Sequence, residues 1–97
     1  GPVVTVSKVK NLEQAIACSN KSPFGLHTAI FTNNINNAHK AINELECAGV
    51  MVNDSTDYRI DAMPFGGVKR SGMGREGVKS AIEAMSETKI VCFKLKI

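Results

Sequence analysis

The chain has 97 residues, of which 43% are hydrophobic and 22% charged, and its formal net charge is +3. This length fits one small domain or a piece of a larger one, and the composition is typical of a globular protein. With one Tyr, four Phe and no Trp, the chain lacks the aromatic surface on which bases stack, which argues against a nucleic-acid partner. It has no apolar run of membrane-spanning length and no opening signal peptide, so we expect a cytoplasmic protein without a membrane partner.

Three cysteines, Cys18, Cys47 and Cys92, are far apart in the sequence and form no Cys-x-x-Cys pair. This spacing argues against a zinc site and against a disulfide framework, so no metal site is predicted. Each cysteine has apolar neighbours, which favours a buried, reduced thiol over a nucleophile. His27 and His39 lack a carboxylate at a spacing that suggests a catalytic pair, so we expect structural roles for both.

The first half of the chain alternates between strand and helix patterns. Residues 3–9 form a β-branched run typical of a buried strand, and Asn11 is a candidate cap for the helix that follows. The pattern continues with a strand at 26–31, an amphipathic helix that stops at Gly49, and a strand at 50–53. The cap candidates for this helix are Thr32, Asn33 and Asn34. This alternation predicts an α/β fold, a three-layer fragment built on a parallel βαβαβ sheet.

A long glycine-rich loop follows the third predicted strand and contains the segment Met63–Glu76. Functional sites in open α/β sheets lie beyond the carboxyl ends of the strands, so we expect this loop to line an active site. The chain closes with a helix at 78–85 and a strand at 90–97, in which Lys94 and Lys96 alternate with apolar residues. A half-exposed strand of this kind needs a neighbouring sheet edge, which another subunit could provide.

Two motifs in this region admit more than one interpretation. Arg59, flanked by Asp57 and Asp61, is either part of a solvated ion-pair cluster or an anchor for a carboxylate or phosphate. Residues 72–77 match the dinucleotide fingerprint Gly-x-Gly-x-x-Gly. Because no strand directly precedes the match and no acidic residue follows a further strand, we interpret it as accidental and predict no cofactor-binding residue in the chain.

Several phrases in register resemble one family. The phrases are Met63-Pro-Phe-Gly-Gly-Val-Lys, Ser71-Gly-x-Gly-Arg-Glu-Gly, Ser86-Glu-Thr-Lys, Ser22-Pro-Phe-Gly-Leu, Ala29-Ile-Phe-Thr and the opening Gly1-Pro-Val-Val. Together they resemble the C-terminal portion of the NAD(P)-dependent aldehyde dehydrogenase superfamily, and the likeness covers essentially the whole chain. The resemblance implies a catalytic-domain part at 1–86 and an oligomerisation strand at 87–97, through which the intact enzyme forms a dimer or tetramer.

The resemblance also implies which parts of the machinery lie elsewhere. In the family, a cysteine thiolate attacks the aldehyde to give a thiohemiacetal, hydride passes to NAD or NADP, and the resulting thioester is hydrolysed to the acid. The family's nucleophilic cysteine, general-base glutamate and dinucleotide-binding domain would precede Gly1, so NAD or NADP would be bound mainly by upstream residues. We therefore expect the 97-residue chain to be a fragment that is inactive alone.

Three residues receive site roles from the resemblance. Phe65 of the Pro-Phe-Gly-Gly phrase would line the aldehyde pocket, and Glu76 would relay a proton outward from the missing general base. Arg59 is a candidate substrate-binding residue, because the phrase that contains it is similar to members acting on lactaldehyde, glyceraldehyde phosphate or semialdehydes. The phrase has one extra residue before Arg59, which leaves the substrate open. The alternative function is a stand-alone dimerising interaction module derived from the same fold.

Overall fold

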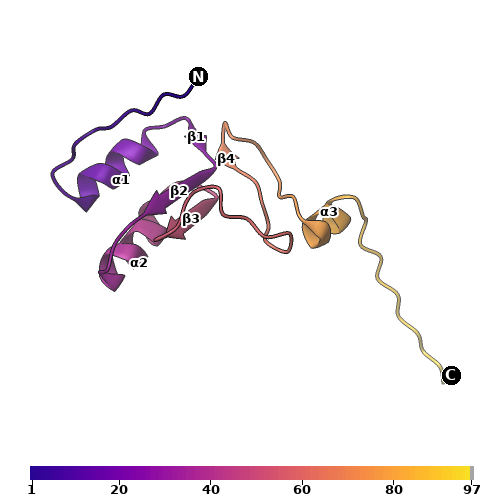
Figure 1. Ribbon diagram of the computed structural model, residues 1–97. Coiled ribbons are helices and arrows are strands. Elements are labelled where there is room, and N and C mark those ends of the chain that lie inside the picture. The colour runs from indigo at the N-terminus through magenta and orange to yellow at the C-terminus, as the bar shows by residue number, and fades with distance from the viewer. Residues whose placement is uncertain (97) are drawn as a thin grey trace.

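The computed structural model describes residues 1–96 and contains one parallel and one antiparallel strand pair with three helices (Figure 1). Its elements, in chain order, are α1 (Leu12–Asn20), β1 (Phe24–Gly25), β2 (His27–Ile30), α2 (Ile35–Glu44), β3 (Gly49–Val52), β4 (Val68–Lys69) and α3 (Val78–Ala84). The α/β class predicted from the sequence is confirmed.

Asparagine caps start the first two helices: Asn11, as predicted, and Asn34, one of the three candidates for the second. The Asn11 side chain accepts a hydrogen bond from the Gln14 backbone N–H at 2.9 Å, and the Gln14 side chain accepts one from the Lys10 backbone N–H at 2.7 Å. At α2, the Asn34 side chain accepts from the backbone N–H groups of the second and third helical residues. These bonds satisfy amide groups that would otherwise lack a partner at the helix start. The second helix ends at Glu44, earlier than the predicted stop at Gly49.

The central unit is β2–α2–β3, in which the two strands are parallel and directly paired. The register runs from His27 opposite Gly49 to Ile30 opposite Val52. Asn53 closes the far end: its side chain accepts from the Thr32 N–H at 2.8 Å and donates to the Thr32 carbonyl at 3.0 Å. Asn53 has a φ of 59°, a left-handed conformation that asparagine tolerates better than most residues. The last strand–helix–strand part of the predicted βαβαβ sheet is therefore present.

Of the two terminal strands predicted, the one at 3–9 is wrong within the described residues, whereas the one at 90–97, expected to pair with the sheet of another subunit, stays a prediction. Residues 3–9 belong to no strand, and Val3 and Val6 are 81% and 90% exposed. Residues 90–96 are extended but unpaired, and Ile97 lies outside the described residues. A strand needs a partner for its backbone N–H and C=O groups, and residues 1–96 offer no partner to either segment. The full five-element parallel sheet and its three layers are therefore not confirmed.

A small antiparallel pair, β1 with β4, was not expected from the sequence. It brings Lys69, which has a φ of 54°, against the end of α1. The Lys69 ammonium donates to the Asn20 carbonyl at 2.9 Å and pairs with the Glu46 carboxylate at 2.7 Å. A cation at a helix C-terminus interacts favourably with the helix dipole and with its free carbonyls.

Lys40 links the first two helices. Its ammonium lies 3.4 Å from the Glu13 carboxylate of α1 and 3.2 Å from that of Glu44 in α2. A backbone hydrogen bond at the start of α1, followed by the contact with Lys40, lowers the pKa of Glu13 from its ordinary value. The Glu44 carboxylate, and then that of Glu13, raise the pKa of Lys40. All three groups face solvent, so the cluster orients the helices more than it stabilises them.

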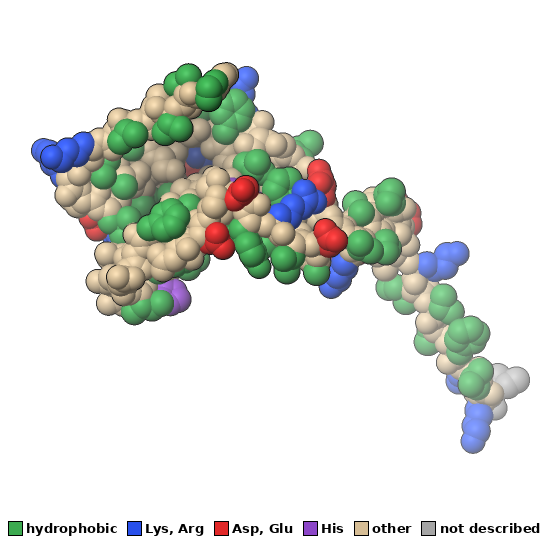
Figure 2. Space-filling view, in the orientation of Figure 1, with side chains coloured by type: hydrophobic (Ala, Val, Ile, Leu, Met, Phe, Trp, Pro, Cys, Tyr) green, Lys and Arg blue, Asp and Glu red, His purple; other side chains and the backbone are tan. Residues whose placement is uncertain are grey.

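Very little of the chain is buried. Among the described residues, the buried apolar side chains are Ile16, Ala38 and Ala41, while the hydrophobic side chains of the C-terminal segment stand out along its length (Figure 2). The radius of gyration is 19.1 Å over an outline of 72 × 35 × 23 Å. A compact domain of this length would have a radius of about 12–13 Å. The fold therefore exposes apolar faces that are suited to packing against further protein.

This exposure also corrects the expectation for the cysteines. Cys18 of α1 and Cys92 of the C-terminal extension are exposed rather than buried. Only Cys47 is partly buried, with its thiol donating to the Gly49 carbonyl at 3.2 Å. Within residues 1–96, no helix is long and apolar enough to cross a membrane.

Replacing Asn20 with alanine tests the junction between the helices. The Asn20 side chain donates to the Glu44 carbonyl at 2.7 Å and accepts from the Glu46 N–H at 2.9 Å. We expect Asn20→Ala to lower the free energy of unfolding by about 1–2 kcal/mol, because two hydrogen bonds are lost. Urea unfolding followed by circular dichroism measures the change. Asn36→Ala, on the exposed surface of α2, is the matched control, and equal effects of the two variants would contradict the assignment.

Candidate active site

The glycine-rich loop folds back along the sheet after β3. The Thr56 carbonyl lies 2.9 Å from Nδ1 of His27, the first residue of β2. Phe65 then packs against the same imidazole, with ring centroids 5.2 Å apart and an angle of 83° between the planes. The loop residues therefore gather at the amino end of β2. The expectation that they lie beyond the carboxyl ends of the strands is wrong, because the His27 contacts draw the loop to the opposite end.

The structure brings the three predicted site residues together. Phe65 and Glu76 face each other in an isolated antiparallel bridge, in which the Phe65 N–H donates to the Glu76 carbonyl at 3.0 Å and the Glu76 N–H donates back to Phe65. The Arg59 guanidinium carbon lies 4.1 Å from the centre of the Phe65 ring. One Arg59 nitrogen, Nη2, lies 3.3 Å from Oε2 of Glu76. Residues that are far apart in sequence thus form one cluster, which we call the Arg59 cluster: His27, Arg59, Phe65 and Glu76.

Within the Arg59 cluster, the guanidinium of Arg59 remains partly exposed to solvent. The Arg59 side chain is 43% exposed and that of Glu76 is 71% exposed, so the ion pair between them is weak on its own. The Phe65 ring adds a cation–π contact, worth about 0.5–1 kcal/mol at an exposed site. A guanidinium has five N–H donors in one plane, and a single Glu76 oxygen does not occupy them all. The arrangement can therefore hold an anion without rebuilding the site.

Tight packing shapes the loop between Phe65 and Glu76. A Cβ on Gly66 would lie 2.4 Å from the Gly74 carbonyl oxygen, and one on Gly67 would lie 2.4 Å from the Ser71 Cβ. The Arg75 guanidinium donates to the carbonyls of Gly67 at 3.0 Å and Gly74 at 2.7 Å. A cavity of about 470 Å³ lies alongside, lined by Leu26, Ala84 and loop residues that include Phe65 and Glu76. Arg75 thus serves to close this loop upon itself.

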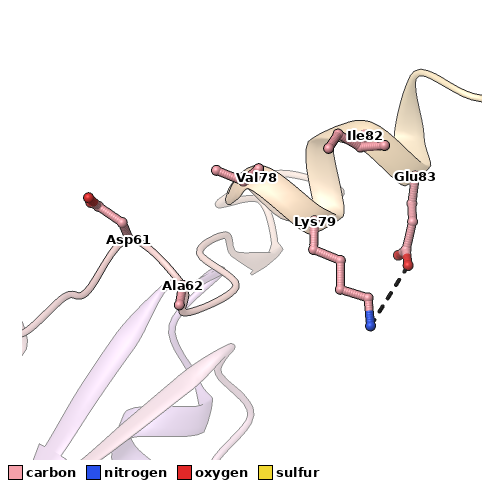
Figure 3. A pocket seen from close by; sticks show the side chains of 6 residues that line it. All are labelled: Asp61, Ala62, Val78, Lys79, Ile82 and Glu83. Atoms are coloured by element: carbon pink, nitrogen blue, oxygen red, sulfur yellow. Dashed lines mark ion pairs between the residues drawn. The ribbon is translucent and has the colours of Figure 1, made fainter.

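A larger cavity lies elsewhere. It measures about 750 Å³ and is lined by Asp61, Ala62, Val78, Lys79, Ile82 and Glu83 (Figure 3). Lys79 and Glu83 pair with each other along α3, with 4.0 Å between their charged atoms. No set of polar groups converges on a common point there, whereas the Arg59 cluster combines a cation, a carboxylate and an aromatic wall. The Arg59 cluster is therefore the better candidate for the functional site than the larger cavity.

Other candidate sites gain little from the structure. The match at 72–77 lies between a two-residue antiparallel strand and the seven-residue α3, which is not the parallel βαβ setting of a dinucleotide site. Within residues 1–96, no three of the His, Cys, Asp and Glu side chains are grouped to hold a metal ion. His39 lies on the exposed surface of α2, away from any such group.

Comparison with known proteins identifies the family. The model of the aldehyde dehydrogenase family matches residues 1–91. The chain belongs to this family. It is 54% identical over 91 residues to the lactaldehyde dehydrogenase of Methanococcus maripaludis, an alignment that covers 94% of this chain and 20% of that protein. The recognition predicted from the motifs is confirmed.

Solved aldehyde dehydrogenases agree with this assignment. The crystal structure of aldehyde dehydrogenase 21 from Physcomitrella patens, in complex with its product succinate, matches with a TM-score of 0.87 and 44% identity over 92% of this chain and 18% of that one. The glyceraldehyde-3-phosphate dehydrogenase of Methanocaldococcus jannaschii, complexed with NADP, matches with a TM-score of 0.77 and 55% identity. This match covers 80% of this chain and 17% of that one. The chain thus spans about a fifth of the length of the relatives it matches.

One member of the Arg59 cluster was not predicted. His27 was expected to be a structural residue of the strand, yet it contacts both Thr56 and Phe65. Its position opposite Gly49 in the strand register is the only sequence signal that pointed to it, since the missing side chain leaves room for a ring. The alignment of β2 with β3 must be known before this signal can be used.

Gly66→Ala tests whether the loop geometry is required. The added Cβ would collide with the backbone of Gly74, so we expect a loss of about 1–3 kcal/mol in the free energy of unfolding. Thermal unfolding followed by circular dichroism measures the loss. Met73→Ala is the matched control in the same loop, because Met73 is 100% exposed. A Gly66→Ala variant as stable as Met73→Ala would contradict the packing described above.

Proposed function

We propose that this chain is the C-terminal part of an NAD(P)-dependent aldehyde dehydrogenase that oxidises an aldehyde to a carboxylic acid through a cysteine thiohemiacetal and thioester. Membership of the family and the assembly of the Arg59 cluster support the proposal. Residues 1–86 would complete the catalytic domain, and residues 87–97 would form the oligomerisation strand. The observation that carries the proposal is the Arg59 guanidinium held over the Phe65 ring.

The chain itself supplies binding and orientation. Phe65 would form an apolar wall that holds the aldehyde in line for attack. When bound, NAD or NADP accepts the hydride. Cys18 and Cys92 are exposed on α1 and on the C-terminal extension, and the Cys47 thiol donates to the Gly49 carbonyl. We infer that the nucleophile and the residues holding NAD or NADP belong to the rest of the subunit, and that the 97-residue chain alone is inactive.

We propose that the substrate carries an anionic group that Arg59 binds. A planar guanidinium binds a carboxylate or phosphate through parallel hydrogen bonds. The named substrates and products of several relatives fit this chemistry: glyceraldehyde 3-phosphate, succinate and aspartate semialdehyde. Lactaldehyde, the named substrate of another relative, has no such charge, so the choice between these classes depends on Arg59.

Glu76 has two supported roles in this proposal. Its carboxylate pairs with Arg59 at 3.3 Å, which orients the guanidinium over Phe65. The same carboxylate is 71% exposed and could pass a proton from the general base of the intact enzyme to water. Both roles need a charged Glu76, so Glu76→Gln would weaken substrate orientation and proton transfer together.

Arg59→Met in the full-length enzyme tests the proposed substrate class. Initial rates of aldehyde-dependent NAD or NADP reduction would be measured with succinic semialdehyde and with butanal, aldehydes of equal length that differ in the carboxylate. We expect KM for succinic semialdehyde to rise about 10- to 100-fold, since a hydrogen bond to a charged group contributes about 1.5–3 kcal/mol. KM for butanal should change less than about twofold, because butanal has no anion for Arg59 to bind.

Arg70→Met provides the matched control, because Arg70 carries the same charge in the same exposed loop. If Arg59→Met raised KM for both aldehydes equally, or if Arg70→Met raised KM for succinic semialdehyde as much as Arg59→Met, Arg59 would contribute only to the overall positive charge of the protein. Absence of any aldehyde-dependent reduction by the intact enzyme would overturn the proposed reaction itself.

The C-terminal segment supports a proposed homo-oligomer. Phe93 is 79% exposed, and Ile90 and Leu95 are 91% and 87% exposed on a segment that pairs with no other part of the chain that the structure describes. An extended apolar segment of this kind can add a strand to the sheet of another subunit. The same observation supports the alternative function, a stand-alone dimerising module, if the chain occurs without catalytic residues.

Phe93→Ser in the full-length enzyme tests the oligomer. We expect a shift toward smaller species at micromolar concentration, because a buried Phe contributes about 1.5–3 kcal/mol. Size-exclusion chromatography with light scattering measures the mass. Lys94→Ser, on the neighbouring position of the same segment, should leave the mass unchanged. An unaltered mass for Phe93→Ser would exclude this segment from the interface.

A further inference from the structure

His27 is held on three sides by different parts of the chain. Its Nδ1 atom lies 2.9 Å from the Thr56 carbonyl oxygen, so the Nδ1–H tautomer donates a hydrogen bond to the loop. Its ring meets the Phe65 ring nearly at a right angle, at 5.2 Å between centroids. This edge-to-face geometry is a favoured one for aromatic pairs. The imidazole therefore joins two points of the same loop.

Gly49 provides the third side. It lies directly opposite His27 in the parallel register of β2 and β3. A Cβ built on Gly49 would lie 2.6 Å from Cδ2 of His27 and 2.8 Å from Nε2. The imidazole thus lies over the backbone of Gly49 in space that any side chain would take. The ring is fixed to the rigid strand pair, and the loop residues are fixed to the ring.

Both contacts of His27 act on Arg59. Thr56 precedes Arg59 by three residues, and a turn between Ser55 and Tyr58, with an N–H···O distance of 3.3 Å, spans part of the gap. Phe65 is the ring over which the Arg59 guanidinium lies, at 4.1 Å. Without His27, the backbone leading to Arg59 loses its tether and the Phe65 ring loses its edge contact. The guanidinium would then sample more positions, and binding an anion would have to order it.

We propose that His27 is a positioning residue that fixes the Arg59–Phe65 pair and thereby sets the preference of the enzyme for anionic over uncharged aldehydes. The proposal rests on the proposed function of Arg59 as the anion anchor. His27 need not touch the substrate. It orders a cation that does, so its effect falls chiefly on KM for anionic aldehydes. Any loosening of the Phe65 wall acts on both kinds of aldehyde and cancels in the ratio of their KM values.

The test uses His27→Ala and His27→Phe in the full-length enzyme, assayed with succinic semialdehyde and butanal. For His27→Ala we expect KM for succinic semialdehyde to rise about fivefold, which corresponds to the loss of one ordinary hydrogen bond and one aromatic contact after relaxation. This rise is measured relative to KM for butanal, because a loosened Phe65 wall would affect both aldehydes alike. His27→Phe keeps the ring and loses the donor, so its KM for succinic semialdehyde should lie between those of the wild type and His27→Ala.

His39→Ala, on the exposed surface of α2, is the matched control and should leave every constant unchanged. A rise in KM for both aldehydes by the same factor, or a fall in kcat alone, would overturn the proposal, because His27 would then only support the fold. If His27→Ala does not yield folded protein, the same comparison is made with His27→Phe. An unchanged KM for succinic semialdehyde in His27→Phe would then contradict the proposal, because the hydrogen bond to Thr56 would have no effect on the position of Arg59.

A double variant separates this proposal from the function on which it rests. In the Arg59→Met background, His27→Ala should not raise KM for succinic semialdehyde further, because the cation that it positions is gone. An additive rise would overturn the proposal. Failure of the anion anchor itself would appear differently, as an Arg59→Met enzyme with unchanged KM. If only the role of His27 is wrong, Arg59→Met raises KM for succinic semialdehyde while His27→Ala leaves it unchanged.

Discussion

The backbone bridge between Phe65 and Glu76 is the constraint on which the candidate site depends. Two reciprocal hydrogen bonds place the aromatic ring and the carboxylate side by side and close the glycine-rich loop between them. Arg59 can then satisfy both at once, with its plane over the ring and one nitrogen toward the carboxylate. Without the bridge, a cation–π contact and an exposed ion pair would each be too weak to hold the arginine in one place.

The strand pair sets where this loop is placed. β2 and β3 are short, yet their parallel pairing fixes a register in which His27 lies opposite Gly49 and Ile30 lies opposite Val52. Asn53 clamps the carboxyl end through its side chain, and the loop then returns to the amino end, where the imidazole receives it. A rigid element thus positions a loop that carries the charged groups, a division that is common in binding sites.

The sequence predicted the parts of the fold that depend on local interactions. The caps at Asn11 and Asn34 and the central strand–helix–strand unit follow from side chains that act within a few residues, and all of them are present. The strands at 3–9 and 90–97 were predicted from β-branched or alternating patterns, but a strand also needs a neighbour, and a pattern does not supply one. Likewise Arg59, Phe65 and Glu76 could be named from motifs. The return of the loop to His27 could not, because it depends on contacts between residues far apart in the chain.

The closeness of Gly49 to the imidazole has a consequence for how such enzymes diversify. Any side chain at position 49 would displace the His27 ring, and the displaced ring would alter the contacts of His27 with the loop. The two positions should therefore co-vary in evolution, with a small residue required on one strand wherever a ring occupies the other. If His27 positions the anion anchor as proposed, a lineage could alter its choice of aldehyde through position 49, which makes no contact with the substrate in that proposal.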